Sequence, residues 1–192
     1  MKNSMINLTI TAVVVLTTFS FKPVEKVKKE IKVASSKILW KGYKVTGSHE
    51  GSIAIKSAFL TFEDEKLSGG EFVIDMTTIS STDLQGEYKG KLDGHLKSDD
   101  FFGVDTHPTA VLVFKEVQAE GKYSYSVTGD LTIKGKTNPV TFTISLYGSK
   151  ATATLKVDRS KYDVRYGSQS FFDGLKDKVI YDEFDIVADL EF

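Results

Sequence analysis

Apolar and polar residues alternate with a period of two over most of the chain. The clearest run extends from Tyr123 to Ile133, where apolar residues or glycine occupy every second position and Ser, Thr or Asp fills the others. Similar runs cover residues 140–146, 151–157 and 184–192. Because successive side chains of a strand point to opposite faces, each run has one apolar and one solvated face. The pattern therefore predicts antiparallel strands that pack one side against a core.

Further strands are predicted at residues 38–45, 52–62, 70–76 and 110–117, with turn-forming residues between the runs. About eight strands joined by short turns favour a closed barrel, because closure removes the exposed edges of an open sheet. We therefore predict an all-β fold, an extended antiparallel barrel of about eight strands; a sandwich is the alternative. A barrel of this size is either filled by side chains or holds one small ligand.

One segment departs from the period of two. Apolar residues recur every four positions over residues 84–97, which predicts a short helix there with Asp83 as its N-cap. The loop after this helix carries Phe101 and Phe102. This pair is expected either to fold back onto the core or to form a lip over an apolar cavity.

The N-terminal part of the chain has a different composition. Residues 1–20 have the pattern of a secretory signal peptide, because Lys2 precedes an apolar stretch from Ile6 to Phe19 that is shorter than the roughly 20 residues of a membrane span. An uncleaved anchor or a buried strand is the alternative. Residues 21–36 are rich in charge, which predicts a solvated tether. Residues 37–192 then form one domain, exported and without stable membrane insertion after cleavage.

Composition excludes several classes of protein. The chain has no cysteine, so it has no disulfide framework, thiol nucleophile, iron–sulfur cluster, cysteine-ligated zinc or lipid-modified cysteine. Its net charge of −1 gives no bulk attraction to nucleic acid. Seven of the 25 basic residues and two of the 26 acidic residues precede Ile38, so the predicted barrel carries a net charge of −6.

The candidate catalytic residues form no recognisable arrangement. His49, His95 and His107 lack the spacing of a zinc site, and His107 precedes a proline in a predicted turn. No serine lies in a nucleophile elbow, and no glycine pair has the sequence of a phosphate-binding loop. We therefore predict no catalytic residues, no metal and no cofactor. His49 and His95 remain candidates for polar groups at the mouth of a barrel.

A charged and aromatic cluster follows one predicted strand. It comprises Asp158, Arg159, Ser160, Tyr162 and Arg165. One interpretation is that Arg159 pairs with an aspartate and closes the end of the barrel. The other is that Arg159 contacts an anion or a lipid head group.

Several segments resemble, in order, the YceI-like family of lipid- and polyisoprenoid-binding, lipocalin-like proteins. The matching segments are Ser48–Gly51, Leu67–Met76, Asp83, Gly94–Phe102, His107–Ala110, Thr128–Gly135, Asn138–Val140 and Asp158–Tyr162. Together they span residues 36–192. Two departures are that His107 stands where the family more often has an aromatic residue, and that residues 168–178 match weakly.

The resemblance implies a periplasmic or secreted barrel that holds a long apolar chain, such as a polyisoprenoid or quinone tail or a fatty-acid derivative. It implies a lipid ligand with no further cofactor, and allows a homodimer. We expect the inward faces of the strands to line the tunnel with Ile53, Ile55, Phe59, Phe72, Ile74, Leu112, Phe114, Tyr125, Val127, Leu131, Phe142, Ile144, Phe184 and Ile186. The mouth and lid are expected to include His49, Asp83, His95, Phe101, Phe102 and Arg159.

Two other functions are compatible with the residues alone. A barrel with a solid core would suit a stress-response or surface interaction module. A histidine-dependent hydrolase or metal protein is the third hypothesis. The aromatic residues Tyr125, Phe142 and Phe184 fit a packed core as well as a tunnel wall, so the pattern alone leaves the choice open.

Overall fold

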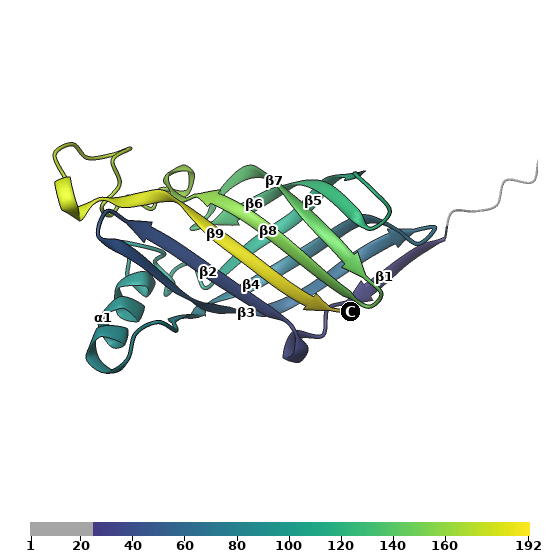
Figure 1. Cartoon of the computed structure of the whole chain (residues 1–192), viewed down its shortest axis with the longest axis horizontal. Coiled ribbons are helices and arrows are strands. Elements are labelled where there is room, and N and C mark those ends of the chain that lie inside the picture. The colour runs from purple at the N-terminus through teal and green to yellow at the C-terminus, as the bar shows by residue number, and fades with distance from the viewer. Residues whose placement is uncertain (1–24) are drawn as a thin grey trace, which may run out of the picture.

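The computed structural model describes residues 25–192, which form a long antiparallel barrel with one helix (Figure 1). The predicted signal peptide, residues 1–20, lies outside the described residues. The helix α1 covers Gly86–Lys97. The strands are β1 (Lys26–Glu30), β2 (Lys37–Lys44), β3 (Gly47–Glu63), β4 (Lys66–Ser81), β5 (Thr109–Ala119), β6 (Ser124–Ile133), β7 (Lys136–Tyr147), β8 (Lys150–Asp158) and β9 (Ile180–Glu191).

Eight of the strands close the barrel. Strands β2 to β9 pair antiparallel with their neighbours in the chain, and β2 also pairs with β9, so no edge remains between the first and last of them. The inward positions of β6 are buried at every second residue, as the period of two predicts. The predicted all-β barrel of about eight strands with one short helix is therefore confirmed.

The start of the described chain is more ordered than a tether. Strand β1 pairs with β3 from Lys26↔Glu63 to Glu30↔Phe59, on the same edge of β3 that β2 occupies further along. All five side chains of β1 are exposed, whereas Ile31 directly after it is buried. Part of the segment expected to be a charged tether is therefore a ninth strand of the sheet, because backbone hydrogen bonds and one buried residue hold it there.

The two ends of the barrel differ in structure. We call the end that carries α1, the loop 98–108 and the loop 163–179 the lid end, on the left in Figure 1. The opposite, closed end holds the tight turns from β3 to β4, from β5 to β6 and from β7 to β8. Leu60 and Val127 are fully buried at the closed end, and Phe62 packs against Phe192 with ring centroids 5.6 Å apart.

Helix α1 begins two residues later than predicted. Gln85 occupies the N-cap position without a side-chain hydrogen bond, so Asp83 does not cap the helix as expected. Gly86 explains the later start, because its φ of +56° is a left-handed conformation that glycine adopts most readily. Asp83 instead pairs with His49, as described below.

Candidate functional site

An apolar cavity of about 180 Å³ lies inside the barrel. Its wall combines the inward faces of the strands with residues of the lid end. The lining residues are Ile38, Trp40, Gly42, Ile53, Phe72, Ile74, Met76, Ile79, Leu96, Phe101, Phe102, Ala110, Leu112, Phe114, Leu131, Ile133, Phe142, Ile144, Ala153, Leu155, Val157, Arg159, Ile180, Tyr181, Phe184, Ile186, Ala188 and Leu190. Apart from Arg159, Trp40 and Tyr181, these side chains carry no polar group.

Most of the residues expected to line a tunnel lie on this wall. They are Ile53, Phe72, Ile74, Leu112, Phe114, Leu131, Phe142, Ile144, Phe184 and Ile186. Aromatic rings form part of the wall on neighbouring strands, since Phe114 stacks on Phe72 at 5.8 Å and meets Phe142 edge to face at 5.5 Å. The side chains of β4, β5 and β7 therefore converge on one apolar space.

Four expected residues do not line the cavity. Ile55, Tyr125 and Val127 are buried outside its wall. Phe59 points outward, where the Lys28 ammonium lies 3.7 Å from its ring centroid. A register irregularity between Ile55 and Ser57 explains Phe59, because one extra residue moves every later side chain of β3 to the other face.

Several residues of the cavity wall are absent from the set expected from the sequence, although the alternation along their strands indicates them. Ile38 and Trp40 alternate along β2, and Leu155 and Val157 alternate along β8, so the same period of two placed all of them inward. Trp40 is held by a hydrogen bond from its Nε1 to the carbonyl of Ser52 at 3.3 Å.

The Phe pair of the lid end folds into the barrel. Phe101 and Phe102 are both 7% exposed and both line the cavity. Lys134, in the turn between β6 and β7, donates from its Nζ to the carbonyls of Asp99 at 2.8 Å and Phe101 at 3.0 Å. The loop is therefore fixed over the cavity by a neighbouring turn, and its aromatic rings form the roof.

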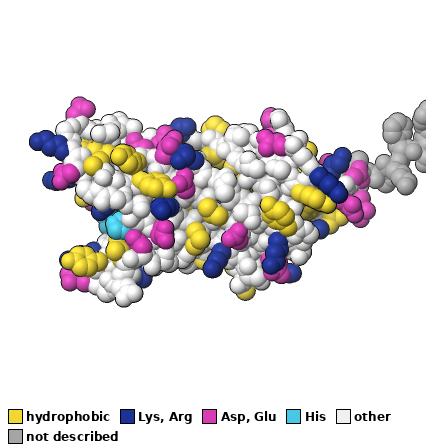
Figure 2. Space-filling model, in the orientation of Figure 1, with side chains coloured by type: hydrophobic (Ala, Val, Ile, Leu, Met, Phe, Trp, Pro, Cys, Tyr) yellow, Lys and Arg dark blue, Asp and Glu magenta, His cyan; other side chains and the backbone are white. Residues whose placement is uncertain are grey.

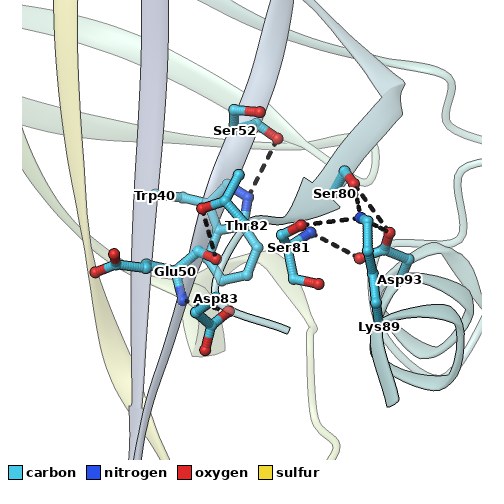
Figure 3. Close-up of polar contacts among 9 residues, drawn as sticks. All are labelled: Trp40, Glu50, Ser52, Ser80, Ser81, Thr82, Asp83, Lys89 and Asp93. Atoms are coloured by element: carbon cyan, nitrogen blue, oxygen red, sulfur yellow. Dashed lines mark hydrogen bonds and ion pairs between the residues drawn. The ribbon is translucent and has the colours of Figure 1, made fainter. Parts of the chain in front are cut away.

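Helix α1 is latched to the end of β4 by a polar cluster (Figure 3). The Asp93 carboxylate accepts from the Ser81 backbone at 2.7 Å and from the Ser80 hydroxyl at 2.9 Å, and pairs with the Lys89 ammonium at 2.5 Å. Lys89 also donates to the carbonyl of Ser81 at 2.9 Å. Burial would raise the pKa of Asp93, but the hydrogen bonds from Lys89, Ser81 and Ser80 outweigh it and lower the pKa to about 2.

His49 and Asp83 form a pair, but they do not touch the cavity. His49 Nδ1 lies 2.8 Å from Asp83 Oδ2, and the Glu50 amide donates to Asp83 Oδ1 at 3.4 Å. Burial would raise the pKa of Asp83, but the hydrogen bonds from His49 and Glu50 leave it below its ordinary value. Neither side chain lines the cavity, so the pair joins β3 to the segment before α1 rather than forming the mouth.

His95 lies between the roof and the loop 163–179. Its ring meets Phe101 at 5.4 Å and Tyr166 at 4.3 Å, both edge to face. Burial lowers the pKa of His95, so the neutral ring is favoured. His95 therefore packs against Phe101 of the roof and does not itself line the cavity.

Arg159 is a buried cation at the lid end. It is 2% exposed and donates to the carbonyls of Val164 at 2.8 Å, Ile180 at 2.9 Å and Tyr181 at 3.3 Å. Its Nη2 also lies 3.3 Å from Asp182 Oδ1. The interpretation that Arg159 pairs with an aspartate at the end of the barrel matches this geometry.

The described residues contain no assembled metal site. Within residues 25–192, no group of three or more His, Asp or Glu side chains is placed to hold a metal ion. No helix in this part of the chain has both the length and the apolar character needed to cross a bilayer.

The sequence matches the family description "YceI-like domain" over residues 14–192. A UPF0312 protein of Pseudomonas putida (strain W619) is 33% identical over 107 residues, which cover 53% of this chain and 54% of the relative. A UPF0312 protein of Staphylococcus epidermidis is 35% identical over 102 residues, covering 49% and 53%. The match thus spans about half the length of these curated relatives.

Solved structures share the architecture. Burkholderia cenocepacia BcnA superimposes with a TM-score of 0.67 at 25% identity, over 83% of this chain and 98% of that chain. A polyisoprenoid binding domain from Saccharophagus degradans, implicated in plant cell wall breakdown, has a TM-score of 0.56 at 14% identity, over 84% and 95%. At 14% identity the second likeness supports the fold alone.

Proposed function

Because the chain belongs to the YceI-like family, we propose that it is an exported, non-enzymatic carrier or scavenger that holds the long apolar chain of a lipid inside its barrel. The ligand class we propose is a polyisoprenoid, a quinone tail or a fatty-acid derivative. A solved protein of the same fold is described as a polyisoprenoid binding domain, and we extend that ligand class to this chain as part of the proposal.

The observation that carries the proposal is the apolar cavity of about 180 Å³. A cavity needs roughly 10–15 Å³ to hold one water molecule. A water molecule has one non-hydrogen atom, so this cavity has room for about a dozen non-hydrogen atoms of a ligand. Burial of each methylene group contributes about 0.8 kcal/mol, so a tail of this size binds firmly without a charged anchor. The same cavity weighs against the alternative of a solid-core interaction module.

The residues around the cavity offer little to a chemical reaction. His49 pairs with Asp83 away from the wall, and Arg159 is engaged by backbone carbonyls. A binding function uses the apolar wall directly, whereas a hydrolase would need a nucleophile and a base that face the same space. These placements support binding rather than catalysis.

Export is proposed from the N-terminal sequence, in which Lys2 precedes an apolar stretch. Fractionation of the host, followed by mass determination of the mature N-terminus, tests it. Recovery of the intact chain in the cytoplasm would contradict export without affecting the binding proposal.

Native mass spectrometry of protein purified from its own host, with uptake of a fluorescent isoprenoid, tests binding. We expect a co-purified lipid and saturable uptake. Ala153→Phe places a ring in the cavity and should abolish uptake, whereas Thr154→Phe places the same ring on the exposed face of β8 and should leave it unchanged. The absence of both co-purified lipid and uptake in the unmodified protein would refute the proposal.

A further inference from the structure

Within residues 25–192, the one charged side chain on the cavity wall, Arg159, is already held by other groups of the protein. The Arg159 guanidinium donates three hydrogen bonds to backbone carbonyls, and its charge is balanced by Asp182, whose Oδ1 lies 3.3 Å from Nη2. The indole N–H of Trp40 is engaged by the Ser52 carbonyl. A charged group that entered this apolar space would lose its hydration and would have to compete with Asp182 for Arg159, so the polar end of a bound lipid belongs outside the cavity.

A second concavity of about 810 Å³ adjoins the cavity at the lid end. Ile180 lines both spaces, so the apolar interior and this outer groove adjoin at the start of β9. The Ile180 amide donates to the carbonyl of Gly167 at 2.8 Å, which ties the start of β9 to the loop 163–179. A lipid whose tail fills the cavity would therefore meet the groove with its polar end.

The groove carries balanced charge. Its basic side chains are Lys44, Lys134, Arg165 and Lys178, and its acidic side chains are Asp99, Asp100, Asp163 and Asp177. Arg165 is already paired with Asp163 at 2.6 Å, and Lys134 with two backbone carbonyls. On the face drawn in Figure 2, acidic and basic side chains are mixed around the lid end. This arrangement offers hydrogen-bond donors and acceptors together without a positive field that would attract an anion.

Two half-exposed aromatic rings also border the groove. Tyr166 is 50% exposed and Phe172 is 49% exposed. Tyr166 packs edge to face on His95 at 4.3 Å, and the Phe172 amide donates to the carbonyl of the fully buried Ser168 at 3.1 Å. Each ring presents a flat apolar surface beside polar groups. This combination suits a head group that can stack on the ring and form hydrogen bonds at its edges.

We propose that this groove binds the polar end of the lipid and that it favours an uncharged head with hydrogen-bonding groups over an anionic head. This inference rests on the proposed function, because it assigns the head of the ligand whose tail occupies the cavity. The groove should prefer an alcohol, a quinol or a glycosyl group as the head, and should disfavour a carboxylate or a phosphate.

Three ligands with the same fifteen-carbon tail test the proposal by displacement of a fluorescent isoprenoid. Farnesol carries a neutral polar head, farnesoic acid is ionised at pH 8, and farnesene has no head. We expect farnesol to bind about tenfold more tightly than the acid, a modest difference on the scale of binding energies. Equal or tighter binding of the acid would overturn the inference.

A substitution in the groove separates the head site from the tail site. The variant Phe172→Ala should weaken farnesol several-fold while leaving farnesene unchanged. Tyr147→Ala, an exposed tyrosine at the closed end, is the matched control and should change neither. Equal weakening of both ligands, or of neither, would refute the head site. If farnesol and farnesene both fail to displace the probe from the unmodified protein, the proposed function itself fails.

Discussion

Gly51 lies directly against the Trp40 indole: a Cβ atom on Gly51 would stand 2.5 Å from the ring and 2.0 Å from the Ser80 carbonyl oxygen. Backbone cannot yield at that distance without moving β3 away from β4. We therefore predict that Gly51→Ala lowers the free energy of unfolding by about 1–3 kcal/mol through overpacking. Urea denaturation measures it.

The control for this substitution is Gly69→Ala on the neighbouring strand, where a Cβ would meet Thr61 at an ordinary 3.7 Å. We expect a change within about 0.5 kcal/mol. If the two variants have equal stability, the close approach of Gly51 to Trp40 does not constrain the sheet.

Asp93 should make the latch of α1 sensitive to acid. Because its folded pKa is about 2, below the ordinary 3.8, its stabilisation is present above the ordinary value and is lost as the pH falls through the folded one. After allowance for solvent screening, we expect Asp93→Asn to remove about 1–2 kcal/mol at pH 7. The difference from the unmodified protein should shrink as the pH falls from 4 towards 2, as measured by urea denaturation at each pH.

Glu87→Gln is the matched control on the same helix. Glu87 also pairs with a lysine four residues away, Lys91, but its side chain is 78% exposed and this ion pair lies entirely within α1. We expect a loss below about 0.5 kcal/mol. Equal effects of the two substitutions would show that the latch adds nothing beyond an ordinary helical ion pair.

Lys134 should control the rate of ligand exchange. Lys134→Met removes two hydrogen bonds that hold the loop over the cavity, each of which contributes about 1 kcal/mol. We expect faster amide exchange in residues 99–104 and faster release of a bound fluorescent isoprenoid. Lys136→Met, at the start of β7, is the control. If Lys134→Met changes neither amide exchange in residues 99–104 nor the rate of ligand release, Lys134 does not fix the roof.

Arg159 should be essential for folding rather than for anion binding. Arg159→Met leaves three carbonyls and Asp182 without their partner, so we expect a loss of about 3–5 kcal/mol. Arg159→Lys should not restore it, because an ammonium lacks the planar fork of donors. Arg165→Met, at an exposed ion pair, should cost less than about 1 kcal/mol.

The size of the cavity predicts how affinity depends on ligand length. In a series of prenols, affinity should rise with each added isoprene unit until about a dozen non-hydrogen atoms are buried, and then level off. Displacement titrations measure it. A continued rise through much longer tails would mean that the closed end, packed with Leu60 and Val127, opens to admit them.

Much of the wall could be predicted from the sequence because side chains along a regular strand alternate. The prediction fails for Phe59 because the irregularity between Ile55 and Ser57 exchanges the two faces of β3, and both faces of that segment are apolar. Tyr125 and Val127 lie on the correct face, but the depth at which the cavity ends depends on packing between strands far apart in the chain. The groove depends on residues from several loops, which no local pattern brings together.

Strand β1 and the C-terminal Phe192 both lie at the closed end, where Lys29 approaches the rings of Phe62 and Phe192. Residue 25 and residue 192 therefore both lie towards the end of the barrel opposite the lid end (Figure 1). A tag, fusion partner or surface attachment placed at either of these points would leave the lid end facing solution. Immobilised protein should thus exchange ligand at the same rate as free protein.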